Sequence, residues 1–309
     1  MNRRLTGAVI IILLLFSVLG SIYLAVRQQL ESPRTGLARR TAVSPRSVGV
    51  IDIYGPVQAG RSAGDIFAQD ELTRITSNIR RFRRDHRIKA VILRINSPGG
   101  TVGAIQEIIS EIERVRESGK PVVASIADIG ASGGYYLASA CDKVVVNPGS
   151  ITGGIGVMFI ASDMSGLLER VGVNVEVIKS GPFKDTGSFH RSFTPQERSY
   201  LQELIDDAYS QFIDQVSRGR DMSREEVGPL ARGQVFTGRQ AVDNGLADRL
   251  GDTTTAHSVA EELAGVTGTK MVRVPVRRLG RFFGLLNLAG RFDVFGQGRI
   301  SGLAYLYRH

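Results

Sequence analysis

The chain has 309 residues, of which 42% are hydrophobic and 22% are charged. This is the composition of a globular protein with enough residues for one large domain or two small ones. A single cysteine, Cys141, and four scattered histidines exclude a disulfide framework and a cysteine-rich metal site, so we expect no metal and no cofactor.

The net charge of +9 is concentrated at the two ends of the chain. Residues 1–46 carry seven arginines and one glutamate, and residues 270–309 carry eight basic residues and one aspartate. The segment between them holds 24 basic and 28 acidic residues. Basic ends on a slightly acidic body fit a protein held against an anionic membrane better than a reader of nucleic acid, so we expect no nucleic-acid partner.

Residues 5–26 form an uncharged run dominated by Ile, Leu and Val, long enough to cross a bilayer as one helix. Arg3 and Arg4 precede this run, so we expect an uncleaved signal anchor in a bacterial cytoplasmic membrane, with residues 1–4 in the cytoplasm and the body outside. The alternative is a cleaved signal peptide. Residues 27–47 have the composition of a stalk linker, and residues 271–309 that of a basic amphipathic tail.

Between residues 48 and 270, strand and helix patterns alternate, which predicts one α/β domain with a mainly parallel sheet. Strands are expected at 48–53, 89–96, 121–127, 143–146 and 173–178, with another after the glycine turn 151–157 and a last one at 271–277. Helices are expected at 65–84, 102–117, 133–140, 164–170, 194–217, 223–232, 238–244 and 253–263.

A serine lies in a glycine-rich turn between a predicted strand and a predicted helix, Ile129-Gly-Ala-Ser-Gly-Gly-Tyr-Tyr136. Such a turn holds Ser132 clear of its own backbone, beside the unpaired first N–H groups of the helix. This suits an acyl-transfer nucleophile, whereas the simpler interpretation is a serine that only caps the helix. The oxyanion would need two N–H donors, for which Gly133 and the Gly99–Gly100 pair are candidates.

A nucleophilic serine also needs a base, and a histidine is the first possibility. The turn matches the G-x-S-x-G pattern of hydrolases that use serine, histidine and an acid. Neither His190 nor His257 lies in a loop that follows a strand with an aspartate before it, so we consider this arrangement the weaker one.

The second possibility is a Ser–Lys dyad, because a lysine acts as a base when burial lowers its pKa. The chain has only six lysines, and Lys179 and Lys184 lie together where a predicted strand passes into a loop. Phe183 is a possible source of desolvation for Lys184. Asp185 would instead raise the lysine pKa unless its carboxylate points away.

Four motifs, taken in chain order, resemble those of the signal peptide peptidase A family of bacterial membrane serine proteases. They are Asn96-Ser-Pro-Gly-Gly100, Ala131-Ser-Gly-Gly-Tyr-Tyr136, Ile151-Thr-Gly-Gly-Ile-Gly-Val157 and Lys179-Ser-Gly-Pro-Phe-Lys-Asp185. The resemblance covers residues 48–265 and implies a Clp-protease/crotonase-like fold. It implies that Ser132 is the nucleophile and Lys184 the general base, with Gly99 and Gly133 as oxyanion donors.

The resemblance further implies the cleavage of leftover signal peptides and other apolar peptides by a ring-like homo-oligomer, with each dyad completed between neighbouring subunits. One position departs from the family, whose third motif commonly reads Thr-Gly-Ser-Ile-Gly-Val with a serine that hydrogen-bonds the lysine. Gly154 occupies that position here, and Ser150 and Thr152 are the nearest hydroxyl groups in sequence.

Three alternative functions remain open from the sequence. A related membrane protease would act on stomatin-like membrane proteins, and a crotonase-type enzyme would act on an acyl-CoA. A non-catalytic membrane scaffold would use the fold only for assembly.

Overall fold

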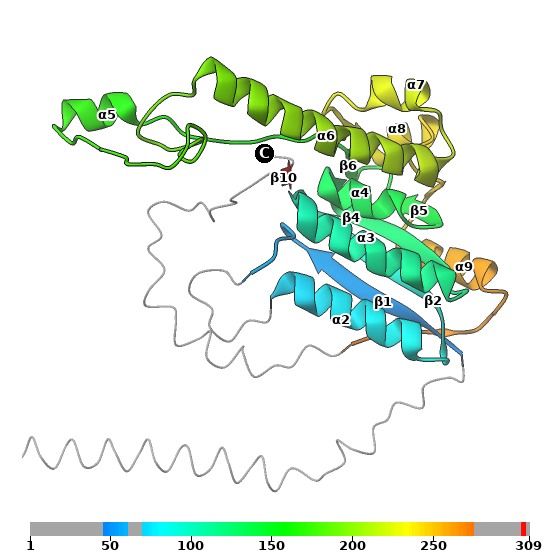
Figure 1. The fold of residues 1–309 in the computed structure, drawn as a ribbon. Coiled ribbons are helices and arrows are strands. Elements are labelled where there is room, and N and C mark those ends of the chain that lie inside the picture. The colour runs from blue at the N-terminus through cyan, green and yellow to red at the C-terminus, as the bar shows by residue number, and fades with distance from the viewer. Residues whose placement is uncertain (1–45, 61–69, 275–303, 307–309) are drawn as a thin grey trace, which may run out of the picture. The chain divides into compact units, whose positions relative to one another are not determined.

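The computed structural model describes residues 46–60, 70–274 and 304–306 (Figure 1). The chain divides into two compact units, 1–44 and 45–309, and every described residue belongs to the second. The predicted anchor over 5–26 and most of the predicted stalk and tail lie outside the described residues. Within the described ranges, no helix combines the length and the apolar composition needed to cross a bilayer.

A mainly parallel sheet forms the centre of the fold, in the strand order β7-β6-β4-β2-β1-β9. Strand β5 pairs with the first half of β4 and with β8, and β6 and β7 are the antiparallel neighbours in this sheet. The predicted α/β class with a mainly parallel sheet is therefore confirmed. The strand bounds are β1 (Ser47–Tyr54), β2 (Ile88–Ser97), β4 (Val122–Ala131), β5 (Lys143–Val146), β6 (Ile151–Gly153), β7 (Val235–Thr237), β8 (Arg249–Leu250) and β9 (Lys270–Arg273).

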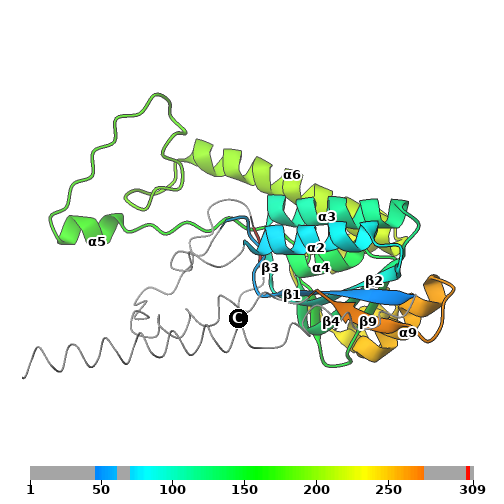
Figure 2. The same cartoon turned by 90° about the horizontal axis from the view of Figure 1, so that it is seen from below.

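Helices cover both faces of this sheet, as Figure 2 shows. Helices α2 (Glu71–Arg84) and α3 (Val102–Glu117) lie on one face, and α9 (Thr253–Leu263) lies on the other. Successive residues of a strand point to opposite faces, so Ile51 and Ile53 pack with α2 and α3 while Val48 and Val50 pack with α9. Two covered faces account for the nearly continuous apolar runs of the central strands.

Helix α6 (Pro195–Arg220) begins at the predicted capping motif. The Oγ1 of Thr194 accepts from the N–H of Glu197 at 3.2 Å, and the Glu197 carboxylate accepts from the N–H of Thr194 at 2.9 Å. Farther along, the ring of Phe212 stacks on Tyr136 of α4 (Gly133–Ser139) with centroids 4.4 Å apart. The other helical segments are α5 (Ser165–Arg170), α7 (Arg224–Val227), a 3-10 turn at Gly228–Leu230 and α8 (Gly238–Asp243).

The segment 159–193, here called the arm, projects from the body beside the N-terminal half of α6 (Figures 1 and 2). It contains α5 but not the strand predicted at 173–178, so that prediction was wrong for a single chain. Val173, Val175 and Val177 alternate as in a strand but are 47%, 43% and 41% exposed. A strand needs a neighbouring backbone to bond to, and none of the described segments pairs with these residues.

The last strand of the sheet, β9, pairs with β1 in the register Ser47↔Lys270 to Val50↔Arg273. It lies within the segment predicted as a strand at 271–277, apart from its first residue. The sheet therefore continues to Arg273, three residues into the segment 271–309 that was predicted as the tail.

Candidate active site

Ser132 joins the end of β4 to the start of α4, in the turn expected from the sequence. Its backbone angles are φ 54° and ψ −120°, a combination that residues with a Cβ rarely adopt and that costs about 1–3 kcal/mol. Two backbone hydrogen bonds hold the turn, since the N–H of Ser132 donates to Gly153 at 2.7 Å and its carbonyl accepts from Tyr136 at 2.8 Å. The surrounding structure therefore enforces one strained conformation at a buried serine.

The pairing of the strands brings three of the four sequence motifs together at this turn. Strand β4 pairs with β6 in the register Ala131↔Gly153, which places Ser132 beside the glycine turn of the third motif. On its other side, β4 pairs with β2 in the register Ser97↔Gly130, which places the first motif there. The fourth motif, residues 179–185, lies on the arm, which projects away from the part of the body that holds β4 and α4 (Figure 1).

The two glycines after the serine allow the first turn of α4 to lie directly against the end of β2. A Cβ added to Gly134 would lie 2.6 Å from the carbonyl oxygen of Ser97, and one added to Gly133 would lie 3.0 Å from the backbone nitrogen of Gly100. A real Cβ would force a shift of the chain at Gly134, and at Gly133 it would be tighter than most Cβ contacts. The predicted glycine-rich turn thus has a packing role as well as a conformational one.

Of the predicted oxyanion donors, Gly133 is the first residue of α4, so its N–H has no partner inside the helix. The N–H of Gly99 already donates to the Oγ of Ser97 at 3.2 Å. The neighbouring amide of Gly100 is the one that lies close to Gly133. Gly99 stays a prediction, and Gly100, considered from the sequence only as part of the glycine pair, is a second candidate donor.

Gly99 and Gly100 belong to a short strand, β3 (Gly99–Thr101). One edge of β3 is bonded to Val57, which donates to the carbonyl of Gly99 at 2.8 Å and accepts from Thr101 at 2.9 Å. The other edge pairs antiparallel with β10 (Ala304–Leu306) in the register Tyr305↔Gly100. The strand next to Ser132 therefore has an edge to which an extended peptide segment can pair.

Lys184 is exposed, and its ammonium makes no hydrogen bond or ion pair with the described part of the chain. The desolvation expected from Phe183 is not present within one chain. The Phe183 ring is 46% exposed and packs against Tyr200 of α6 with centroids 5.3 Å apart. A water-poor environment for this lysine would have to come from a second molecule.

The Asp185 carboxylate does not bond to Lys184, its neighbour in sequence. One of its oxygens accepts from the ammonium of Lys179 at 2.6 Å, and both accept from the guanidinium of Arg191 at 2.7 and 2.9 Å. Hydrogen bonds from Arg191, then from Lys179, hold the pKa of the Asp185 carboxyl well below its usual range. Lys179 is thus engaged in an ion pair, which makes Lys184 the better candidate for a base.

The hydroxyl groups considered as replacements for the missing serine partner of the lysine are both buried and both occupied. Ser150 donates to the carbonyl of Ala127, and Thr152 donates to the carbonyl of Gly130 at 2.7 Å. Gly154 itself has φ +62°, and a Cβ there would lie 3.3 Å from the nitrogen of Ser132. Neither hydroxyl is free to orient an incoming lysine without first giving up its present bond.

Neither histidine considered for a serine–histidine pair lies at the serine turn. The His257 ring is 2.8 Å from the Oγ1 of Thr269, on the face of the sheet covered by α9. The His190 ring packs edge-on against Phe189, on the arm. Among the described residues, no three His, Cys, Asp or Glu side chains cluster as a metal site would require.

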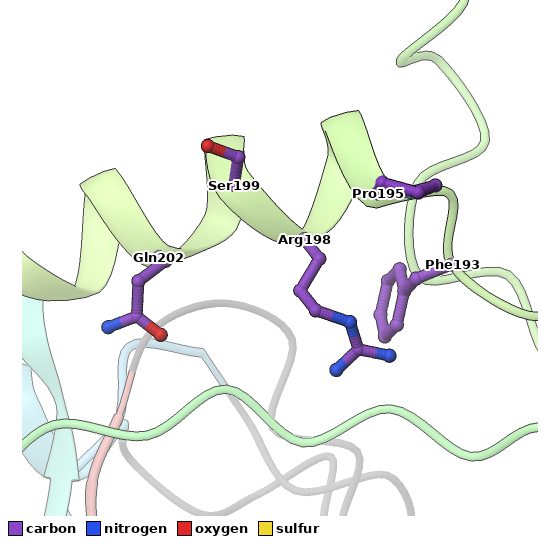
Figure 3. A pocket seen from close by; sticks show the side chains of 5 residues that line it. All are labelled: Phe193, Pro195, Arg198, Ser199 and Gln202. Carbon is purple, nitrogen blue, oxygen red and sulfur yellow. The ribbon is translucent and has the colours of Figure 1, made fainter.

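A separate pocket of about 520 Å³ lies along the first turns of α6 (Figure 3). The guanidinium of Arg198 lies 5.9 Å from the centre of the Phe193 ring. Figure 3 shows both side chains on one side of the helix with Gln202, while Ser199 points away. None of the predicted site residues lines this pocket.

Comparison with known proteins identifies the family to which these motifs belong. The profile of peptidase family S49 matches residues 114–267. This range includes the serine turn and the loop that carries Lys179 and Lys184, here called the lysine loop. The chain belongs to peptidase family S49. The expected resemblance to the signal peptide peptidase A proteins is confirmed, and the expected class of enzyme, a serine peptidase, is that of the family.

Three curated relatives show the extent of the match. The chain is 48% identical over 182 residues to the putative protease slr0021 of Synechocystis sp., covering 59% of this chain and 65% of the relative. It is 34% identical over 219 residues to Protease 4 of Haemophilus influenzae, covering 71% and 35%. It is 33% identical over 210 residues to the putative signal peptide peptidase SppA of Enterococcus faecium, covering 67% and 61%. The chain thus spans less than two thirds of each of these curated relatives.

Proposed function

We propose that this chain is a membrane-anchored serine endopeptidase of Clp-protease/crotonase-like fold that degrades cleaved signal peptides and other apolar peptides. Ser132 is the nucleophile, and Lys184 of a neighbouring subunit is the general base. The observation that carries the proposal is the strained turn at Ser132, held at φ 54° by hydrogen bonds from both sides and placed beside the edge of β3. Backbone strain of this kind is characteristic of functional sites.

In the proposed mechanism, neutral Lys184 accepts the Ser132 proton as the serine oxygen attacks the scissile carbonyl carbon. The carbonyl oxygen becomes an oxyanion that the N–H of Gly133 and a second amide of the Gly99–Gly100 pair stabilise. The ammonium of Lys184 then gives its proton to the leaving amine as the C–N bond breaks. Lys184 next accepts a proton from water as the water oxygen attacks the acyl carbon, and it gives this proton to the Ser132 oxygen as the ester bond breaks.

The assembly into a ring-like homo-oligomer is part of this proposal because the two dyad residues do not meet within one chain. The arm that carries Lys184 has many apolar side chains that are 40% or more exposed. They include Ile160, Met164, Leu167, Val171, Val173, Val175, Val177, Ile178, Phe183 and Phe189. Exposed apolar surface on this scale is typical of a protein–protein contact. A neighbouring subunit that covers the arm would also exclude water from Lys184 and so favour the neutral amine that a general base requires.

The proposed substrate is an extended peptide that pairs with the edge of β3. The antiparallel pairing of β10 with β3 supports this, because it places a peptide segment along the strand next to Ser132. The apolar run at residues 5–26 supports anchoring in a bacterial cytoplasmic membrane with the catalytic domain outside the cytoplasm. The name of the Enterococcus relative supports signal peptides as the substrate class. The alternatives, a stomatin-directed protease or a membrane scaffold, find no support among the relatives described above.

The proposal is tested by labelling the purified full-length chain with a serine-reactive fluorophosphonate probe. The wild-type protein should be labelled at Ser132 and should cleave apolar peptides, whereas Ser132→Ala should do neither while remaining folded. Lys184→Ala should lose cleavage, and Lys179→Ala should keep it. Cleavage by Ser132→Ala at the wild-type rate would disprove the proposal, and loss of activity in Lys179→Ala but not Lys184→Ala would move the base to Lys179.

A further inference from the structure

The loop that carries Lys184 is closed by a group of four charged side chains. Arg191 lies between two carboxylates. It donates from Nε and Nη2 to both oxygens of Asp185, and from Nη1 and Nη2 to both oxygens of Glu197. Lys179 completes the group with its bond to Asp185. The charges of two positive and two negative side chains therefore balance one another. Three of the four lie on the arm, and Glu197 lies on α6.

This charged group joins the lysine loop to the start of the long helix α6. The Glu197 side chain is only 2% exposed, and it also accepts from the N–H of Thr194 at 2.9 Å and from the Oγ1 of Thr186 at 3.0 Å. A buried carboxylate with this many donors is fixed in position. Arg191 therefore ties Asp185, one residue after Lys184, to the first turn of α6.

The backbone of the lysine loop forms a series of tight turns, and the side chain of Arg191 bonds this loop to α6. The N–H of Lys184 donates to the carbonyl of Gly181 at 3.2 Å, and the N–H of Ser188 donates to the carbonyl of Asp185 at 3.1 Å. These local bonds shape the loop but do not attach it to α6. The attachment comes from Phe183 against Tyr200, from Thr186 to Glu197 and from the two forked ion pairs of Arg191.

We propose that Arg191 is a positioning residue for the general base, which holds the Lys184 loop on α6 and keeps the Asp185 carboxylate away from the Lys184 ammonium. The inference rests on the proposed function, in which Lys184 is the base. A planar guanidinium can bridge two carboxylates with paired hydrogen bonds, which neither a lysine nor a glutamine can do.

The second part of this role is electrostatic. The charged groups bonded to the Asp185 carboxylate are Lys179 before it and Arg191 after it, with Glu197 of α6 on the far side of Arg191. Without Arg191, the Asp185 carboxylate keeps its bond from Lys179 at Oδ1, and its Oδ2 is left to pair with the ammonium of Lys184. Such pairing favours the protonated form of a lysine, which cannot accept a proton from the serine.

The test compares full-length Arg191→Gln with Arg198→Gln. Arg198 is a matched control because it also lies near the start of α6, is exposed, and has its guanidinium over the Phe193 ring rather than in an ion pair with the described residues. For Arg191→Gln we expect kcat on an apolar peptide to fall about 10–100-fold with KM nearly unchanged, because the base is misplaced. We also expect the ascending limb of its pH–rate profile to move about one pH unit higher. Arg198→Gln should keep the wild-type kcat and pH profile.

The double variant Asp185→Asn/Arg191→Gln separates positioning from charge. Its ascending limb should return to the wild-type pH, because the Asp185 carboxylate is gone, while kcat stays low because the loop still lacks the ion pairs of Arg191 to α6. Arg191→Lys keeps a positive charge but cannot bridge both carboxylates, so it should show smaller changes in the same direction. If Arg191→Gln does not fold, as judged by thermal unfolding, Arg191→Lys carries the same test.

The inference is overturned if Arg191→Gln has the wild-type kcat and pH profile. It is also overturned if kcat falls with no movement of the ascending limb, since a merely structural role would give that result. These outcomes differ from a failure of the proposed function, which would appear as activity in Ser132→Ala or Lys184→Ala. With both of those variants inactive, wild-type behaviour of Arg191→Gln refutes only the role of Arg191.

Discussion

The backbone N–H of Ser132 donates to the carbonyl oxygen of Gly153 at 2.7 Å, across the join between β4 and β6. This bond continues the pairing of the two strands by one step and holds the serine at φ 54°, where its Cβ is strained. Asp221 is the other non-glycine residue with positive φ in the described part of the chain. The fold therefore imposes an unfavourable conformation at the one serine that the sequence marks as a nucleophile.

The strain predicts an order of stability among variants at this position. Ser132→Gly should be more stable than Ser132→Ala by about 1–2 kcal/mol, because glycine adopts these angles without a steric cost. Both variants should lack peptidase activity. Urea unfolding monitored by circular dichroism checks the difference, and equal stability of the two variants would show that the turn relaxes.

The positive φ of Gly154 predicts a second effect. Gly154 has φ +62°, so Gly154→Ala should lower the free energy of unfolding by about 1–2 kcal/mol. Its new Cβ would also lie 3.3 Å from the nitrogen of Ser132, so we expect a lower kcat. Gly156→Ala is the control, because its Cβ would meet Gly233 only at an ordinary 3.6 Å. Thermal unfolding and peptide hydrolysis of both variants check this, and a neutral Gly154→Ala would contradict it.

The pairing of β10 with β3 predicts competition between the C-terminal residues and substrate. A chain that ends at Leu303 lacks β10, so its kcat/KM for an apolar peptide should rise about 2–10-fold as the edge of β3 becomes free. A chain that ends at Tyr307 keeps β10 and serves as the control. Equal or lower activity after the longer truncation would show that β10 does not occupy the substrate edge.

The ion pairs of Arg191 on the arm and of Arg87 after α2 predict that the protein loses stability in acid. Bonds from Arg191 place the pKa values of the Asp185 and Glu197 carboxyls below their ordinary range, and Arg87 lowers that of Asp85 to about 2. A carboxyl with a lowered folded pKa contributes stability above its unfolded value of about 4, and this is lost as the pH falls below it. The urea midpoint should therefore fall between pH 7 and about pH 3, and fall less in Arg191→Gln. An equal fall in both proteins would contradict the assignment.

Much of the body could be predicted from local sequence patterns. Helix α3 (Val102–Glu117), strand β5 (Lys143–Val146) and helix α9 (Thr253–Leu263) have the expected bounds, because each has a clear apolar period and is covered within the chain. The serine turn lies where the glycines indicated. For each of these elements, the apolar residues that pack against it lie in the same folded unit of the chain.

The features that could not be predicted depend on partners distant in sequence or outside the chain. The segment 173–178 has the alternation of a strand, yet its backbone has no neighbour among the described residues to pair with. The direction of the Asp185 carboxylate depends on Arg191 and Lys179, which local patterns do not identify as its partners. The separation of Lys184 from Ser132 follows from the path of the arm, which apolar periodicity does not encode.

The most direct test of the central claim, a dyad shared between subunits, is to co-express Ser132→Ala and Lys184→Ala with different affinity tags. Each variant is inactive alone, but a mixed oligomer contains interfaces with an intact serine on one side and an intact lysine on the other. Sequential purification on both tags should recover about a quarter of the wild-type peptidase activity, as random mixing across a head-to-tail interface predicts. Doubly tagged oligomers without activity would contradict a dyad formed between subunits.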